Sequence, residues 1–262
     1  MRLRPGLPAT LAVLALMTAC ATGRPAGPPP ATPGVVSPHA AGSGTTRPGG
    51  PASPALDGCF TAARGTTETV PDAGGGTLTL GIAGTGPRVI VLSNESDENL
   101  CSWLPFSARL AAAGYRVVLW DYGGNQPSDE LTRLVRRLRS SAATRLVLMG
   151  ASEGAKVSLI AGARVTPRVR GVVSLSAESI LRPAIMVADS VRRLRCPLLL
   201  VTADQDPYGS AQAARQFLAA APGQAKHLVT VAGADHGTAL LAGRSAARVL
   251  PAILAFLHRV LG

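Results

Sequence analysis

Aromatic residues, lysine and acidic residues are all scarce in this chain of 262 residues. Phe, Trp and Tyr make up 3% of it, and Lys156 and Lys226 are the two lysines among 26 basic residues. With 15 acidic residues, the net charge is +11 and comes mostly from arginine. Surfaces that bind nucleic acid interleave basic with aromatic residues, and this sequence has no such patch, so no nucleic-acid partner is expected.

The arginines are expected to spread over helix faces. There they would attract anionic lipid headgroups or envelope polymers. The alternative is that the preference for arginine reflects genome composition alone.

Signatures of cofactor binding are missing as well. The sequence contains neither a glycine-rich dinucleotide loop nor a cluster of His and Cys at metal-ligand spacing. Neither an organic cofactor nor a metal is therefore expected.

The first twenty residues follow the order of an export signal. Two arginines lie within the first four residues, an apolar stretch covers residues 11–17, and the small residues Thr18 and Ala19 precede Cys20. The apolar stretch is too short for a permanent transmembrane helix. This ending resembles a bacterial lipoprotein signal, in which residues 1–19 are removed and Cys20 is lipidated. It predicts an exported protein anchored in the lipid bilayer at the outer face of the cell membrane; the alternative is an ordinary secretory signal cut nearby.

Residues 20–55 differ sharply from the remainder of the chain. They consist almost entirely of Ala, Gly, Pro, Ser and Thr without apolar periodicity, which predicts a disordered tether. Residues 56–262, roughly 205 residues, are enough for one domain with a substantial core.

The remaining cysteines are expected to differ in state. Export implies an oxidising compartment, and Cys59 and Cys101 precede or flank early strands, so we predict a disulfide between them. Cys196 begins an apolar run and is expected to be a buried free thiol. A link between Cys101 and Cys196 would contradict this assignment.

Apolar runs and helical patterns alternate after residue 75, which predicts an α/β fold with a mostly parallel sheet flanked by helices. Strands are expected at residues 77–82, 89–93, 115–121, 145–149, 171–175, 197–202 and 227–231. Helices are expected at residues 103–113, 127–140, 152–163, 184–194, 210–221 and about 238–261. The first two strands are expected to pair through a turn at Gly84-Thr85-Gly86.

The segment Gly150-Ala151-Ser152-Glu153-Gly154 directly follows the strand expected at residues 145–149. A serine between glycines, placed where a strand turns abruptly into a helix, resembles the nucleophile elbow of the α/β-hydrolases. The glycines are needed because the backbone segments approach so closely that a Cβ atom would clash. The resemblance extends over residues 77–261 and includes the segment Trp120-Asp121-Tyr122-Gly123-Gly124.

Two later loops resemble the other parts of the family's catalytic triad. Asp206 lies in Ala203-Asp204-Gln205-Asp206-Pro207, and His236 lies in Ala232-Gly233-Ala234-Asp235-His236-Gly237. The resemblance implies that Ser152 is the nucleophile, His236 the base and Asp206 the residue that orients the imidazole. Asp204 remains an alternative acid.

The same resemblance implies an oxyanion hole that includes the backbone N–H of Glu153. Many family members have His-Gly in the loop that supplies the second donor. This chain has Ser93-Asn94-Glu95-Ser96-Asp97, so the N–H of Glu95 or Ser96 is expected to serve. The carboxylate of Glu153 either complements the helix N-terminus or lies at the pocket mouth, where it would disfavour anionic substrates.

The implied function is hydrolysis of a small carboxylic ester through an acyl-enzyme. About twenty residues separate the strand ending at residue 175 from Cys196, so no cap domain is expected, and an open site suits short or medium esters. Alternatives are a peptidase or thioesterase with the same triad, and a non-catalytic envelope binding protein built on the same scaffold.

Overall fold

The computed structural model describes residues 56–72, 74–122, 126–141, 143, 145–182 and 184–262. The predicted signal peptide, the lipidation site Cys20 and the tether lie outside these residues. Within the described ranges, no helix combines the length and the apolar character needed to cross a bilayer.

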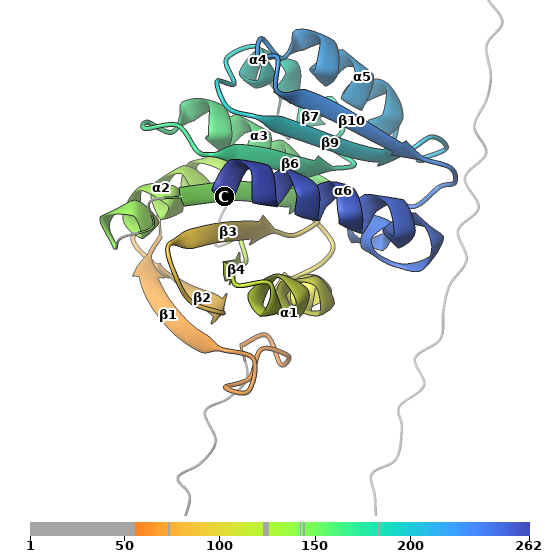
Figure 1. Ribbon diagram of the computed structural model, residues 1–262. Helices are drawn as coiled ribbons and strands as arrows, with labels where there is room; N and C mark the ends of the chain where they lie inside the picture. Colours follow the sequence, from red (N-terminus) through yellow and green to blue (C-terminus); the bar gives the residue numbers. More distant parts are fainter. Residues whose placement is uncertain (1–55, 73, 123–125, 142, 144, 183) are drawn as a thin grey trace, which may run out of the picture. The chain divides into compact units, whose positions relative to one another are not determined.

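The centre of residues 56–262 is an eight-stranded sheet (Figure 1) with the strand order β1-β2-β4-β3-β5-β6-β9-β10. The strands β4, β3, β5, β6, β9 and β10 run parallel to one another, whereas β1 and β2 are antiparallel to their neighbours. The strands are β1 (Thr66–Pro71), β2 (Thr77–Ala83), β3 (Arg88–Ser93), β4 (Arg116–Trp120), β5 (Arg145–Ala151), β6 (Gly171–Leu175), β9 (Leu198–Ala203) and β10 (Lys226–Val231). A separate hairpin pairs β7 (Ile180–Leu181) with β8 (Ile185–Met186).

Helices cover both faces of this sheet. The helices are η1 (Leu100–Trp103), α1 (Leu104–Ala112), α2 (Pro127–Ser140), α3 (Glu153–Arg164), α4 (Val187–Val191), α5 (Ser210–Ala220), η2 (Gly237–Leu241) and α6 (Gly243–Leu261). Apolar side chains of α2, α3, α4 and α5 pack on one face, and those of α1 and α6 pack on the other. The predicted mostly parallel sheet with helices on both sides is confirmed.

The central strands are apolar along nearly their whole length because each faces two cores. In β3, Val89 and Val91 contact the core beneath α2 to α5, while Ile90 and Leu92 contact the core beneath α1 and α6. Successive side chains of a strand point to opposite faces, so a strand covered on both sides has no solvent-facing positions to fill with polar residues.

The predicted pairing of the first two strands is wrong. β2 pairs antiparallel with β4, and β3 pairs parallel with β4 and β5. β4 therefore lies between the two strands that were expected to be neighbours. The reason is the composition of β3, whose continuous apolar run is stable only at the centre of the sheet, with a strand on each side.

The region predicted as a helix at residues 184–194 is also different. It contains β8 followed by the short helix α4, because Ile185 pairs with Leu181 in the β7–β8 hairpin. The edge strand β1 was not predicted, since most of its residues are exposed and carry no apolar alternation.

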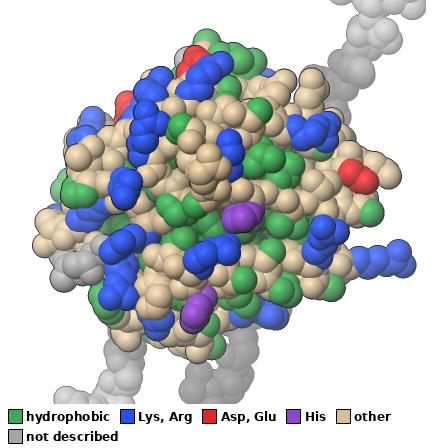
Figure 2. Space-filling model, turned by 45° about the horizontal axis from the view of Figure 1, so that its top comes forward, with side chains coloured by type: hydrophobic (Ala, Val, Ile, Leu, Met, Phe, Trp, Pro, Cys, Tyr) green, Lys and Arg blue, Asp and Glu red, His purple; other side chains and the backbone are tan. Residues whose placement is uncertain are grey.

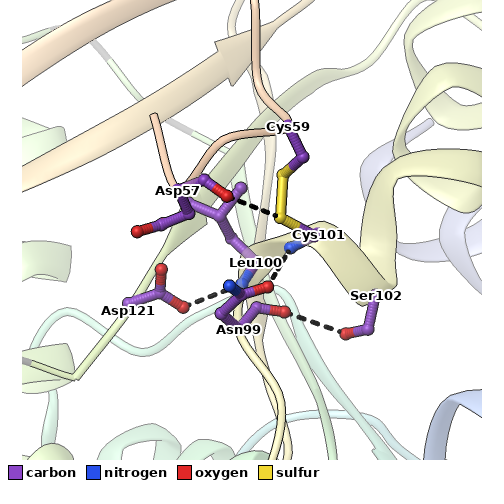
Figure 3. Close-up of a disulfide and its surroundings, with 7 residues drawn as sticks. All are labelled: Asp57, Cys59, Asn99, Leu100, Cys101, Ser102 and Asp121. Atoms are coloured by element: carbon purple, nitrogen blue, oxygen red, sulfur yellow. Dashed lines mark hydrogen bonds between the residues drawn. A yellow bond between two sulfur atoms is a disulfide. The ribbon is translucent and has the colours of Figure 1, made fainter. Parts of the chain in front are cut away.

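The predicted disulfide between Cys59 and Cys101 is present, with the Cα atoms 5.9 Å apart (Figure 3). It fastens the start of the described chain to η1. Asn99 Oδ1 accepts a hydrogen bond from the backbone N–H of Cys101 at 3.0 Å, and Asp121 Oδ1 accepts one from Leu100 at 2.8 Å. The disulfide and these hydrogen bonds thus bring together residues from three separate parts of the sequence.

Cys196 is a free thiol, as predicted, and is half-buried. Burial raises its pKa to about 12, against a smaller opposite effect of Arg168. A thiol held in its neutral form reacts slowly, because the thiolate is the nucleophile.

Candidate active site

Four polar residues meet at one edge of the sheet. Ser152 follows β5, Glu178 follows β6, Asp206 follows β9 and His236 follows β10. Because these strands are parallel, their carboxyl ends lie at the same edge, where sites form in open α/β sheets. The structure therefore brings together the three residues predicted from the sequence and adds Glu178, which was not predicted.

Ser152 lies on a strained turn between β5 and α3. Its backbone has φ 50° and ψ −114°, a conformation that costs a non-glycine residue free energy. A Cβ atom on Gly150 would lie 2.1 Å from the carbonyl oxygen of Gly154, and one on Gly154 would lie 2.1 Å from that of Ser93. The clash expected at both glycines is thus confirmed, and the turn keeps its shape only if both lack a side chain.

Asp206 is bonded to His236. The Nδ1 atom of His236 lies 2.8 Å from Asp206 Oδ2. The same carboxylate accepts hydrogen bonds from the Ser210 hydroxyl at 2.6 Å and from the backbone N–H of Tyr208 at 2.9 Å. Burial raises the pKa of Asp206, but the hydrogen bonds from Ser210, His236 and Tyr208 outweigh it, so the pKa lies below its usual value. An ionised Asp206 accepts a hydrogen bond from the Nδ1–H group, which leaves Nε2 as the basic nitrogen.

Asp204, the alternative acid, is placed elsewhere. Its carboxylate is exposed and accepts a hydrogen bond from the backbone N–H of Gly233 at 2.9 Å, which links the loops that follow β9 and β10. The His236 ring instead contacts Asp206, Glu178 and Tyr208. Asp206 is therefore the carboxylate in position to orient the imidazole.

Glu178 connects the serine to the histidine. The Ser152 hydroxyl donates to Glu178 Oε1 at 3.1 Å, and His236 Nε2 lies 3.6 Å from the same oxygen. Serine oxygen and imidazole nitrogen are thus separated by the span of one bridging atom. In this arrangement the serine proton is directed to a carboxylate instead of the ring.

The Glu178 carboxylate is itself held by Lys156, whose ammonium forms an ion pair with Oε2. Lys156 lies on the first turn of α3, four residues after Ser152, so the countercharge is held by the helix that begins directly after the nucleophile. Both side chains are largely shielded from solvent. Ser176, two residues before Glu178, has a φ of 54° and is a second strained position beside the site.

The loop after β3 lies against the nucleophile elbow. The backbone N–H of Gly154 donates to the carbonyl of Asn94 at 3.0 Å, and the Asn94 side chain donates to the carbonyls of Glu95 and Glu98. The expected oxyanion donors, the N–H groups of Glu153, Glu95 and Ser96, are therefore on adjacent segments. Among the described residues, none accepts a hydrogen bond from the N–H of Glu153.

The Glu95 side chain has a separate role that the sequence did not reveal. Its Oε1 accepts hydrogen bonds from the backbone N–H and the hydroxyl of Thr238, at 2.8 and 2.7 Å. This contact ties the loop after β3 to the start of η2, two residues after His236. A Cβ on Gly237 would lie 2.3 Å from the Glu95 carboxylate, so the close approach requires glycine there.

Two tyrosines border the site. Tyr122 donates its hydroxyl to the carbonyl of Asn94, and burial raises its pKa well above the usual value, with Glu153 as the next cause. Glu153 is half-buried on the first turn of α3, which fits both interpretations made from the sequence. Tyr208 is 66% exposed, and its ring centroid lies 4.5 Å from that of His236. Gly123 and Gly124, which complete the segment with Trp120, lie outside the described residues.

In the part of the chain that the structure describes, no three His, Cys, Asp or Glu side chains are arranged to hold a metal ion. The groups at the site are instead those of acid, base and nucleophile chemistry.

Comparison with known proteins gives matches at the level of structure. No protein-family model matches the sequence, and no curated protein matches it. The esterase domain of a Rhodothermus marinus protein superposes with a TM-score of 0.64 at 23% identity, covering 75% of this chain and 99% of that one. A Paleococcus ferrophilus monoacylglycerol lipase gives a TM-score of 0.61 at 14% identity, with coverage of 69% and 98%. An enol-lactonase from Burkholderia xenovorans LB400 gives 0.60 at 15% identity, with coverage of 73% and 100%.

These matches cover nearly the full length of the compared proteins. Because the sequence identities are low, the matches show the fold alone. The same fold is indicated by the strand order, by the strained serine between β5 and α3, and by the structural neighbours. The chain has the α/β-hydrolase fold.

Proposed function

We propose that this protein is a serine hydrolase that cleaves carboxylic esters through an acyl-enzyme intermediate. The observation that supports it most is the chain of contacts at the sheet edge. Ser152 Oγ and His236 Nε2 flank one oxygen of Glu178, and the other nitrogen of the ring is bonded to Asp206. A base within reach of a hydroxyl and oriented by a carboxylate is the arrangement that nucleophilic catalysis by serine needs.

In the proposed reaction the Ser152 hydroxyl turns from Glu178 to Nε2 as the ester enters. The proton passes to Nε2 while Oγ bonds to the carbonyl carbon. The imidazolium then protonates the departing alcohol oxygen as the ester C–O bond breaks. Water attacks the acyl-serine in the same way, with His236 again taking and returning the proton. The N–H of Glu153, with that of Glu95 or Ser96, would stabilise the negative oxygen.

The proposed substrates are small esters of short or medium chain length. The connection from β6 to β9 contains the β7–β8 hairpin and the short helix α4 across residues 176–182 and 184–197. The structural neighbours named as esterases and a lipase make ester chemistry the first candidate among acyl transfers. Hydrolysis rates on a panel of esters, thioesters and peptides compare the three substrate classes. Within a series of esters, an activity maximum at long acyl groups would contradict the proposed chain length.

Labelling with a fluorophosphonate probe tests the nucleophile. Wild type is expected to become labelled, and Ser152→Ala is expected to lose labelling completely because the attacking oxygen is gone. Ser158→Ala is the matched control, since Ser158 is a buried serine of the same helix. Labelling that persists in Ser152→Ala would overturn the assignment.

The second candidate is a binding protein without catalytic activity, and one observation favours it. The Ser152 hydroxyl is bonded to Glu178, which occupies the space beside the nucleophile. A wild-type protein that is folded yet unlabelled by the probe would support this candidate.

A further inference from the structure

Four arginines surround a cavity at the amino ends of the parallel strands, the end of the sheet away from Ser152. The cavity has a volume of about 440 Å³. Its arginines are Arg168, Arg170, Arg195 and Arg259. Arg168 and Arg170 precede β6, Arg195 precedes β9, and His227 of the lining is the second residue of β10. These are the amino ends of strands whose carboxyl ends carry the catalytic residues, so the cavity is separate from the proposed active site.

Other arginines lie on helices as expected, such as Arg136 on α2 and Arg215 on α5, but these four are clustered. Three of the four lie in loops, and together the four come from three separate segments of the sequence. Arg168 Nη1 donates to the carbonyl of Arg195 at 3.2 Å, which joins two of the contributing loops. The face shown in Figure 2 carries many Lys and Arg side chains and few Asp or Glu side chains.

The positive charge of this cavity is not balanced by neighbouring carboxylates. Its lining contains no aspartate or glutamate. Among the described residues, none of the four arginines forms an ion pair. At the end of α6, the carbonyls of Leu261 and Gly262 accept hydrogen bonds from Arg145 Nη1. Unpaired guanidinium groups held together repel one another, and a bound anion relieves that repulsion.

Phosphate is an anion that these groups fit. A guanidinium presents a planar fork of N–H donors that binds phosphate oxygens in pairs. The wall beneath the arginines is apolar and includes Val169, Pro197 and Val260. A compact cavity with a charged rim suits a single headgroup, whereas a polymer needs a groove along its length. Phe256 is 1% exposed, so its ring is not available for stacking on nucleic-acid bases.

We propose that this cavity, the arginine pocket, binds the phosphate headgroup of an anionic phospholipid at the membrane surface. The proposal stands independently of the ester chemistry, because the pocket shares no residue with the catalytic edge. It also differs from anchoring through Cys20, which would act through acyl chains.

Vesicle binding tests the proposal in the full chain carrying Cys20→Ser, so that no acyl chain contributes. The pocket variant replaces Arg168, Arg170, Arg195 and Arg259 by Gln. The control variant has the same net charge and replaces four exposed arginines elsewhere, Arg136, Arg215, Arg244 and Arg248. Co-sedimentation is measured with phosphatidylglycerol–phosphatidylcholine vesicles and with pure phosphatidylcholine vesicles, and circular dichroism checks that each variant is folded.

Binding to phosphatidylglycerol vesicles is expected to fall about tenfold or more in the pocket variant and less than about threefold in the control. Pure phosphatidylcholine vesicles should bind all forms weakly. An equal loss in both variants would show that only net charge matters and would overturn the proposal. Binding of inorganic phosphate and of duplex DNA is titrated in parallel. A pocket variant that loses either of these while its vesicle binding stays unchanged would also overturn the proposal.

Discussion

At the scale of single residues, the site depends on which carboxylate faces which nitrogen of His236. Asp206 bonds Nδ1 and Glu178 lies beside Nε2. In the proposed reaction, the first contact fixes the tautomer that accepts a proton from serine, and the second places a negative charge where that proton arrives. The carboxylates on opposite sides of the ring would therefore affect the proposed catalysis differently.

Replacing Asp206 by Asn should reduce kcat on the order of 10³- to 10⁴-fold, because an amide no longer holds the Nδ1 proton and the ring can adopt the unproductive tautomer. Asp204→Asn is the matched control on the same loop, and it should change kcat less than about threefold. Steady-state kinetics on a small ester distinguishes them. Equal losses in both variants would remove Asp206 from its proposed role.

The ion pair between Glu178 and Lys156 gives a second residue-scale prediction. Lys156→Met leaves an uncompensated, largely buried carboxylate beside the nucleophile and should lower kcat/KM about tenfold. Glu178→Gln removes the competing charge and should leave kcat/KM within about threefold of wild type. The double variant should recover most of the loss, because the two charges act through each other.

This double-mutant cycle also tests whether Glu178 is essential. A Glu178→Gln variant as inactive as Ser152→Ala would show that the carboxylate takes part in the reaction and does not merely hold the resting site.

Ser152, Asp206 and His236 could be predicted because each lies in a local motif and the three follow a fixed order along the chain. Glu178 could not, since nothing in the segment Ser176-Ala177-Glu178-Ser179 distinguishes it from a surface turn. Its importance arises from a side chain that reaches from the end of β6 to the end of β5. Its one sequence signal was its position just after a strand expected to be parallel.

At the scale of elements, the region around the Cys59–Cys101 disulfide contains Asp121, a carboxyl group with a shifted pKa. Burial raises the pKa of Asp121 to about 7, and the neighbouring Asp57 adds to this through a hydrogen bond and its negative charge. The hydrogen bond from Leu100 opposes the shift. The folded protein therefore keeps a proton on Asp121 that the unfolded chain releases near pH 4.

Because the folded state binds more protons between about pH 4 and pH 7, the stability contributed by this group is present at acid pH and is lost as pH rises through about 7. The free energy of unfolding should thus fall between about pH 4 and pH 7, and Asp121→Asn should flatten this dependence. Urea unfolding of both proteins at the two pH values measures it. An unchanged slope in Asp121→Asn would contradict the assignment.

The positions of the helices and strands along the chain were largely predictable, but the pairing of the strands in the sheet was less predictable. Apolar runs located β3, β4, β5, β6, β9 and β10, because buried parallel strands are apolar throughout. The pairing of β2 with β4 was missed because it joins segments separated by the whole of β3 and α1. Likewise, no local pattern could show that Arg168, Arg195 and Arg259 converge.

At the scale of the whole molecule, the proposed location depends on Cys20. Cys20→Ser should move the protein from the membrane fraction to the soluble fraction, because the acyl chains would no longer attach. The partition is measured by fractionation in buffer of high salt, which screens binding through arginine. A protein that remains in the membrane fraction under these conditions would contradict the proposed lipid anchor.

The direction of the parallel strands separates the proposed active site from the arginine pocket. A protein held to a bilayer by the amino ends of β6, β9 and β10 would turn Ser152 away from the lipid and toward the surrounding medium. Its esters would then arrive by diffusion from outside and not from within the leaflet, and the released acids would leave by the same route.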